Sequence, residues 1–509
     1  MTTLICAGGS GTRVLEAVLH LCAAGLGPDV LRIFVIDPDG TNGNVTQTKT
    51  LVERYRACQE AFGEDLPLFR TKLDLMNGPQ GLRVWNPVNG RQQFGALLNY
   101  QGLSEQQKDV AHLFFTQDEL EMEMNVGFRG HPALGAAALS LMPLYKNDPL
   151  WSQLPQAINQ EVIQGRTEVV IVGSVFGGTG ASAIHPLVRY LRSLPQTNAD
   201  NLKVAAVALV PYFRFSGDAT AQNEEAKAQQ AAQSEWFSLA SRSAAEYYEH
   251  LREHKDWELD AMYWLGDDSP MQVKYSIGGP AQHNPSHFVD LLAGFAFLDF
   301  LKSPPQPGTC CYAGPQESSN DPGQNVLTWG DVPAPSDIVR ENWYKALHRF
   351  HLVGAAHLGF YWPLLKDERL RTLPYCVPWY MDRFTNGSKL STKDNQDRLE
   401  ALSLYFRENY FPWWGQMHAA ERDRVRLFNR RAWFTKDETL KIELNRLGNL
   451  IYPDTELHSL DPVDALFERT IQAGKSVQEG KFPSSTYLAI LAQAAQSMVE
   501  QAARGEASH

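Results

Sequence analysis

The sequence has few cysteines for its length and no excess of positive charge. Six cysteines are spread through 509 residues, without the close spacing that a zinc site or a disulfide framework shows, and this favours a reducing, cytoplasmic location. Lysine and arginine number 46 against 58 acidic residues, which gives a net charge of −12. We therefore do not expect general binding to nucleic acid or to an anionic membrane.

Long uninterrupted apolar runs are also missing. The most apolar predicted helix, residues 285–301, contains Asp290 and Asp299 and is shorter than the roughly 20 residues that a bilayer span needs. The first residues lead directly into a strand and a glycine loop, so no secretory signal is expected there. An apolar content of 43% predicts instead a folded protein without a membrane span.

Predicted strands and helices alternate over the first 302 residues. Strands are expected at 4–6, 31–36, 168–172, 203–210 and 262–265, and helices at 14–24, 132–141, 183–191, 219–254 and 285–301. This alternation predicts an α/β fold, namely a Rossmann-like, doubly wound parallel sheet. Such sheets bind ligands at the carboxyl ends of their strands, so the site is expected there.

The remaining segments differ in composition. Residues 41–125 are polar and weakly patterned, and we interpret them as an insertion outside the sheet. Residues 303–335 are rich in proline and glycine and predict a connector. Residues 336–509 predict a mainly helical carboxy-terminal region, whose many aromatic side chains are expected mostly in its core, with the rest on a surface for a partner or ligand.

The most informative motif is the glycine-rich loop of residues 177–180, which reads Gly177, Gly178, Thr179 and Gly180. A β-branched strand precedes it and a helix follows, an arrangement that directs backbone N–H groups and a helix N-terminus at a phosphate. Glycine lets an oxyanion approach the backbone, and the hydroxyls of Thr179 and Ser182 are further candidate donors. The loop lacks the lysine of a Walker-type ATPase.

Three further loops follow the same logic. The first runs through Gly8, Gly9, Ser10, Gly11 and Thr12, between the first strand and its helix. Asp37 and Asp39 end the second strand, where a carboxylate can accept from a ribose hydroxyl or from a magnesium-bound water. Gly130 and His131 belong to a glycine loop that enters a helix at Pro132.

Taken together, these four loops resemble those of the tubulin/FtsZ family of GTPases over about residues 1–302. The resemblance implies that residues 8–12 and 177–180 hold the α- and β-phosphates of GTP or GDP, with Mg²⁺, while Gly130 and His131 approach the γ-phosphate. It also implies that residues 211–213 border the sugar. The helix beginning at Pro285 resembles the family's central helix, so Asn284 or His287 would read the guanine edge and Phe288 would stack; alternatively, Asn284 is a plain N-cap.

Hydrolysis in that family requires an acidic loop after the central helix, which enters the site of the next subunit. In this chain the corresponding segment is the 303–335 connector, where Asp331 and Asp337 are the candidate catalytic residues. The family's β-rich second domain is replaced by predicted helices. The resemblance thus implies a guanine-nucleotide-binding protein that self-assembles into oligomers or filaments, or binds a protein partner through its carboxy-terminal region; a non-hydrolysing scaffold is the alternative.

Three other motifs allow different interpretations. Residues 7–13 also match the opening of sugar-nucleotide pyrophosphorylases, but the proline-rich stretch and lysine of those enzymes do not follow. His250 and His254 have the H-x-x-E-H spacing of a zinc site, on what is expected to be a solvated helix end. Residues 422–431 form a basic cluster, which is expected to be a solvated helix face rather than a nucleic-acid contact.

Overall fold

A computed structural model gives the arrangement of most of the chain. The described residues are 1–62, 66–76, 81–88, 93–124, 127–128, 131–194, 200–216, 224–254, 256–267, 271–274, 279–303, 306–314, 327–367, 372–374, 376–384, 389–420 and 462–506. Of the predicted site residues, Gly130 lies outside this set, as do residues 422–431 of the basic cluster.

The centre of the molecule is a parallel sheet with the strand order β10-β8-β6-β5-β1-β2-β3, in which the short β4 also pairs with β2. Its strands are β1 (Thr2–Ala7), β2 (Val30–Ile36), β3 (Lys72–Asp74), β4 (Val84–Trp85), β5 (Thr167–Ser174), β6 (Leu202–Leu209), β8 (Ala261–Leu265) and β10 (Thr309–Ala313). A separate parallel pair joins β7 (Phe213–Ser216) to β9 (Met271–Lys274). The predicted α/β fold with a parallel central sheet is confirmed.

Alternating side chains of the central strands enter two different cores. In β1, Leu4 and Cys6 belong to one core, whereas Ile5 and Ala7 belong to the core of the opposite face. In β5, Val170 and Val172 lie on the first side, and Val169 and Ile171 on the second. Burial on both faces explains why these strands are continuous apolar runs rather than alternating ones.

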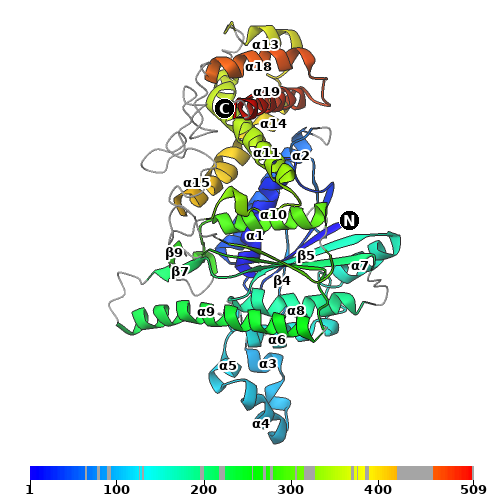
Figure 1. The fold of residues 1–509 in the computed structure, drawn as a ribbon, viewed down its shortest axis with the longest axis vertical. Helices are drawn as coiled ribbons and strands as arrows, with labels where there is room; N and C mark the ends of the chain where they lie inside the picture. The colour runs from blue at the N-terminus through cyan, green and yellow to red at the C-terminus, as the bar shows by residue number, and fades with distance from the viewer. Residues whose placement is uncertain are drawn as a thin grey trace.

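Helices cover both faces of the sheet, which Figure 1 shows edge-on at mid-height. The first face carries α1 (Gly8–Ala23), α2 (Gly43–Phe62) and α10 (Phe288–Lys302), and the second carries α7 (Gln153–Gln164), α8 (Gly178–Arg192) and α9 (Glu224–Glu253). Behind α8 lies α6 (Pro132–Ser140), which packs against it. The sheet is therefore wound on both sides, as the alternation of elements predicts.

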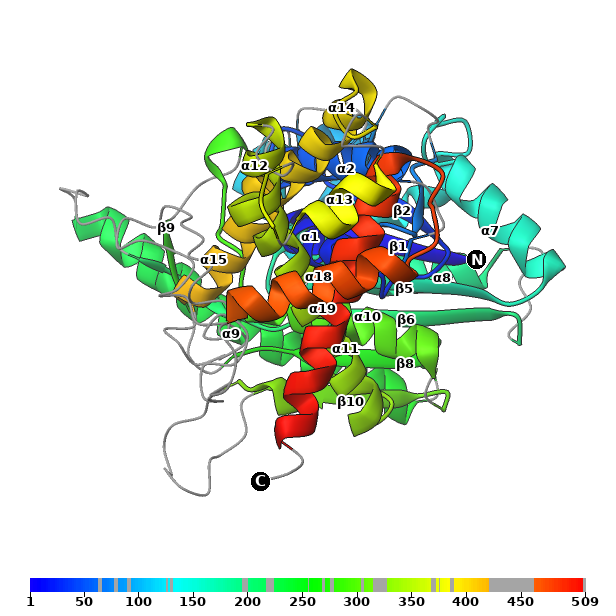
Figure 2. The same cartoon turned by 90° about the horizontal axis from the view of Figure 1, so that it is seen from above.

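The carboxy-terminal region lies on the α1/α10 side, and Figure 2 shows α18 and α19 over these helices. Its described elements are helical: α11 (Asp337–Ala356), α12 (Trp362–Lys366), α13 (Val377–Arg383), α14 (Lys393–Leu404), α15 (Phe411–Ala420), α18 (Pro462–Ser476) and α19 (Pro483–Glu506), with π-helical turns after α11 and α14. Its aromatic side chains reach α1, where the His20 ring packs on Trp413 at 4.4 Å between centroids and its Nδ1 lies 2.7 Å from the Tyr405 hydroxyl.

The interpretation of residues 41–125 as an insertion outside the sheet is wrong for their first half. Helix α2 packs on α1, and both β3 and β4 pair with β2. These strands have three and two residues, too few to show a periodic pattern. Beyond them, α3 (Phe94–Leu97), α4 (Glu105–Phe114) and α5 (Gln117–Glu121) project from the sheet at the end opposite the carboxy-terminal helices (Figure 1).

The 303–335 segment is not only a connector. Residues 309–313 form β10, which pairs in parallel with β8 and extends the sheet by one strand. Its sequence, Thr-Cys-Cys-Tyr-Ala, is only half-buried and is flanked by proline and glycine. The flanking residues explain why composition alone predicted a loop.

The apolar central helix starts three residues later than predicted. Helix α10 begins at Phe288, and its N-cap is His287, whose Nδ1 accepts from the Val289 amide at 3.2 Å. Asp290 completes a capping box by accepting from the His287 amide at 3.0 Å. Asn284 is therefore not the N-cap, because its own amide donates to Asn44 Oδ1 at 3.1 Å and residues 282–287 precede the helix without regular secondary structure.

Close approach of the backbone at Gly180 gives a stability prediction. A methyl group there would lie 2.5 Å from the backbone nitrogen and 2.6 Å from the backbone oxygen of Ser174. Since neither the strand end nor the helix start can move freely, we expect Gly180→Ala to lower the free energy of unfolding by about 2 to 3 kcal/mol in urea titrations. The matched variant Gly40→Ala, which meets nothing within 4 Å, should change it by less than about 0.5 kcal/mol. Equal losses in both would contradict this account.

Candidate functional site

Two glycine loops meet at the carboxyl edge of the sheet. Strands β1 and β5 are neighbours, and the chain order runs outward from them in opposite directions. The first loop continues β1 into α1 and the second continues β5 into α8, so both lie at the point where the strand order reverses. In doubly wound sheets this is where a crevice for a ligand forms.

The two loops touch each other at Gly8. This residue has a φ of +72°, and a methyl group on it would lie 3.2 Å from the Thr179 Cβ. Gly8 and Gly178 are the first residues of α1 and α8, so the contact brings both helix N-termini together. Their N-cap residues, Ala7 and Gly177, have no side chain that can accept a hydrogen bond, which leaves the first N–H groups for an external acceptor.

Hydroxyl groups of the two glycine loops mostly donate hydrogen bonds to backbone carbonyls of the same loop. Thr12 Oγ1 donates to the Gly9 carbonyl at 2.9 Å, and Ser182 Oγ donates to the Gly178 carbonyl at 2.7 Å. The idea that Ser182 donates to a ligand is therefore not supported by its geometry. Gly9, Ser10 and Gly177 are half-buried and lie on the accessible side of the loops.

The acidic second loop lies next to the first. It follows β2, the neighbour of β1, and a methyl group on Gly9 would meet the side-chain amides of Asn44 at 3.3 Å and Asn42 at 3.6 Å. Asp37 Oδ1 accepts from the Asp39 amide at 2.9 Å. Burial raises the pKa of the Asp37 carboxyl to about 7, so this group changes charge near neutral pH.

Residues 279–284, which we call the strap, are hydrogen-bonded to the acidic loop after β2. Asp39 Oδ2 accepts from the Gly279 amide at 2.6 Å, and Asn42 Nδ2 donates to Gln282 Oε1 at 2.5 Å. With the bond from the Asn284 amide to Asn44 Oδ1, three side chains between the end of β2 and the first turn of α2 bind the segment that leads into α10. Sequence reasoning missed Asn42 and Asn44, although asparagines in a turn commonly bond to nearby backbone.

The third loop also approaches this edge. Gly135, one turn into α6, packs directly on Ser182, one turn into α8, so the two helices start side by side. His131 is the N-cap of α6, and its Nδ1 lies 3.1 Å from Glu119 Oε1 on α5. Its side chain is 38% exposed, so the ring is accessible at the start of α6.

Of the two residues predicted to read the base, only Asn284 is partly accessible. His287 is 1% exposed, its Nε2 lies 3.8 Å from Asp267 Oδ2, and burial together with Arg13 lowers its pKa to about 3. A neutral, buried histidine that caps α10 is a structural residue of this edge. Phe288, predicted to stack on the base, is likewise 1% exposed and belongs to the core.

A buried ionic network supports the first loop from beneath. Arg13 Nη2 donates to the Tyr212 hydroxyl, which in turn donates to Asp290 Oδ1 at 2.7 Å. The Arg13 Nε also lies 3.5 Å from Asp290 Oδ2, where both side chains are at most 4% exposed. Burial raises the pKa of Asp290, while Arg13 and Tyr212 favour its charged form.

The network reaches the loop through Ser10, whose Oγ accepts from Arg13 Nη2 at 3.4 Å. One turn further along α1, burial raises the pKa of Glu16 to about 7, and Gln47 Nε2 donates to its carboxyl at 2.7 Å. Arg13 thus places a positive charge within one turn of the glycine loop. The acidic Asp290 in an otherwise apolar helix could have indicated from the sequence that a buried cation such as Arg13 pairs with it.

The remaining candidate groups make local contacts. Asp331 Oδ2 accepts from the Thr328 amide at 2.6 Å, and Asp337 Oδ1 pairs with Arg340 Nη1 at 2.5 Å, so both carboxylates stabilise helix starts. The rings of His250 and His254 contact each other, with centroids 3.9 Å apart and planes tilted by 35°. Within the described ranges, no group of three or more His, Cys, Asp or Glu side chains is arranged to hold a metal ion.

In the described part of the chain, none of the helices combines the length and the apolar character of a bilayer span. The chain matches no protein-family model, no curated protein and no solved structure.

Proposed function

We propose that the carboxyl edge of the sheet around Gly9 binds a nucleotide, with the phosphates on the first turns of α1 and α8. The carrying observation is the contact of Gly8 with Thr179, which joins two helix N-termini without side-chain caps at the point where the strand order reverses. Each N-terminus offers free N–H groups and a partial positive charge to an anion. The buried Arg13, paired with Asp290, lies behind the loop and donates from Nη2 to Ser10 Oγ.

The nucleotide we propose is GTP or GDP. Support comes from the order of the loops, which resembles that of the tubulin/FtsZ family, and from their placement on successive positions of one edge. Asn284, partly accessible on the strap, is the residue best placed to read a base. Its backbone is held by Asn44, next to Gly9, so base and phosphates would be bound by connected segments.

We expect Mg²⁺ to strengthen nucleotide binding through Asp37, and to do so more at high pH. Burial raises the pKa of Asp37 to about 7, so the carboxyl is mostly protonated at pH 6 and mostly ionised at pH 8, and only the ionised form attracts the cation. The gain in affinity from Mg²⁺ should therefore rise by up to about tenfold between these values in calorimetric titrations.

The variant Asp37→Asn controls for the titration of the nucleotide phosphates themselves. It should remove the part of the pH dependence that belongs to the protein and keep the part that belongs to the nucleotide. An unchanged Mg²⁺ dependence in Asp37→Asn would show that the cation is held without this carboxyl.

Whether the bound nucleotide is hydrolysed is a separate question, tested by GTP turnover as a function of protein concentration. A GTPase whose site is completed by a second copy, with Asp331 or Asp337 supplied in trans, would show a rate that rises more than linearly. Those two carboxylates are engaged at helix starts within one chain, and so would have to be released or reoriented. Nucleotide binding without turnover at any concentration would instead identify a nucleotide-binding scaffold.

A further inference from the structure

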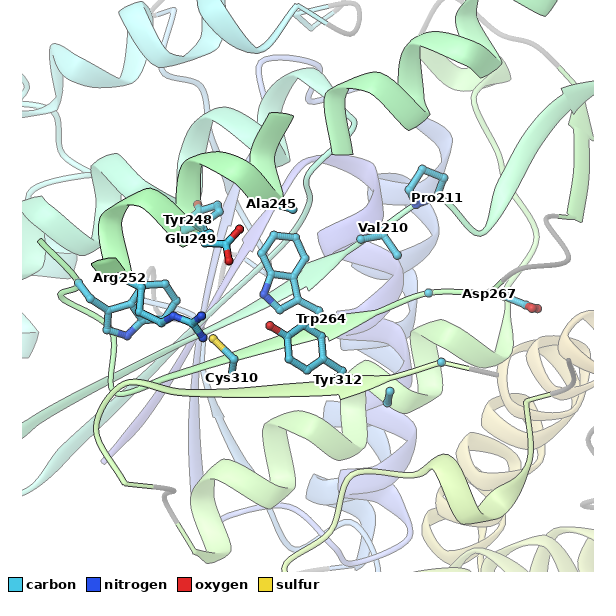
Figure 3. Close-up of a pocket in the computed structure, with 14 residues that line it drawn as sticks. Val210, Pro211, Ala245, Tyr248, Glu249, Arg252, Trp264, Asp267, Cys310 and Tyr312 are labelled. Atoms are coloured by element: carbon cyan, nitrogen blue, oxygen red, sulfur yellow. The ribbon is translucent and has the colours of Figure 1, made fainter. Parts of the chain in front are cut away.

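A second cavity lies between helix α9 and the strands β8 and β10, of which β10 is the edge strand of the sheet. Its volume is about 470 Å³, which is in the range of small-molecule sites. No residue of the two glycine loops lines it, although Pro211, predicted to border the sugar, does. Val210, Gly266 and Gly314, which follow β6, β8 and β10, line the end of the cavity at the carboxyl edge of the sheet. Figure 3 shows its labelled side chains.

Aromatic side chains make two walls of this cavity. Trp264 of β8 and Tyr312 of β10 are partners in the parallel register, so their rings lie side by side on one face of the sheet (Figure 3). Opposite them, Tyr248 of α9 packs on Trp264 with ring centroids 5.8 Å apart and planes at 78°. Because Tyr312 is 73% exposed although it is aromatic, a large stacking surface remains available to a flat ligand.

One end of the cavity carries groups of both charges. Glu249 and Arg252 lie one turn apart on α9 and project toward Trp264 and Cys310 (Figure 3). Both act on the Tyr312 hydroxyl, whose pKa is raised chiefly by burial and by Cys310, with Arg252 lowering it and Glu249 raising it. Neither side chain forms an ion pair with another residue of the described ranges. Nearby, Trp257 Nε1 is buried without a hydrogen-bond partner among the described residues.

We propose that this cavity binds a small aromatic zwitterion, with the chemistry of an aromatic amino acid. Its ring would stack on Trp264 and Tyr312, its carboxylate would pair with Arg252, and its ammonium group would pair with Glu249. A ligand of this kind matches the aromatic surface and both exposed charges at once, whereas an uncharged ring would use the aromatic surface alone.

Calorimetric titration of the full chain with three probes tests the assignment of each charge. L-tryptophan carries both groups, indole-3-propionate lacks the ammonium, and tryptamine lacks the carboxylate. We expect Arg252→Gln to weaken L-tryptophan and indole-3-propionate by about fivefold, as the loss of a partly exposed ion pair does, and to leave tryptamine unchanged. Glu249→Gln should weaken L-tryptophan and tryptamine and leave indole-3-propionate unchanged.

Trp264→Leu tests the stacking wall and should weaken all three probes by about tenfold or more. Two matched controls lie on α9, where Trp236 is 52% exposed and Arg242 pairs with Glu246. Neither residue lines the cavity, so the controls are Trp236→Leu and Arg242→Gln. Both should bind the probes as the wild type does. Absence of saturable L-tryptophan binding up to about 5 mM would overturn the proposal. Equal effects of Arg252→Gln and Glu249→Gln on all three probes would also overturn the proposal. This comparison does not depend on whether Trp264→Leu folds.

Discussion

Replacing Gly9 by aspartate is expected to weaken GTP binding by about 100-fold. Gly9 is half-buried in the first turn of α1, and a side chain there would meet side-chain atoms of Asn42 and Asn44 at 3.3 to 3.6 Å rather than backbone. The loop can therefore accommodate the change. A carboxylate at this place would repel a phosphate about 5 Å away by roughly 3 kcal/mol at an effective dielectric constant near 20, which corresponds to two orders of magnitude in Kd.

Gly9→Asn is the matched control, because asparagine has the shape of aspartate without its charge. It should bind GTP within about threefold of the wild type, since no charge is introduced beside the phosphates. Titration of both variants separates charge from shape. Equal weakening in the two would mean that any side chain blocks the loop, and no weakening in either would mean that the phosphates bind elsewhere.

Removing the buried cation should have the largest effect on stability. Arg13→Met leaves Asp290, which is 0% exposed, without its ionic partner, and also removes the donor to the Tyr212 hydroxyl. Breaking one side of a buried ion pair costs about 3 to 5 kcal/mol, because the remaining charge is desolvated and unpaired. We expect this loss in the free energy of unfolding, measured in urea at a pH at which Asp290 is charged in the unfolded chain.

The double variant Arg13→Met, Asp290→Leu provides the control. Replacing both charges by apolar groups removes the uncompensated anion, so it should recover at least about half of the loss seen in Arg13→Met. Losses that simply add in the double variant would show that the two side chains contribute independently. In that case Arg13 would not be held beneath the glycine loop by Asp290.

Local patterns in the sequence predicted the central sheet and the position of its glycine loops. The strands that were predicted, such as 31–36 and 168–172, are buried on both faces and so are long apolar runs. Glycine loops between such strands and a following helix have few structural alternatives. Because the carboxyl ends of parallel strands share one edge, the sequence also predicted that the first and second loops lie near the residues of 177–180.

Other features depend on contacts that are distant in sequence. The short strands β3, β4 and β10 have two to five residues and form because β2 or β8 offers an open edge. The start of α10 is set by His287 and Asp290, while the strap before it is held by Asn44. The Arg13–Tyr212–Asp290 network joins three segments, and no local pattern specifies such an arrangement.

The most direct test of the proposed nucleotide site is calorimetric titration of the full chain, stripped of any co-purified nucleotide, with GTP and Mg²⁺. The proposed function predicts saturable binding of one nucleotide per chain with a Kd of about 10 μM or lower, stronger than for ATP and reduced in Gly9→Asp. Mass spectrometry of the small molecules released when the purified chain is stripped should identify GTP or GDP. Absence of binding heat with both GTP and GDP up to about 1 mM, together with no nucleotide among the released small molecules, would contradict the account.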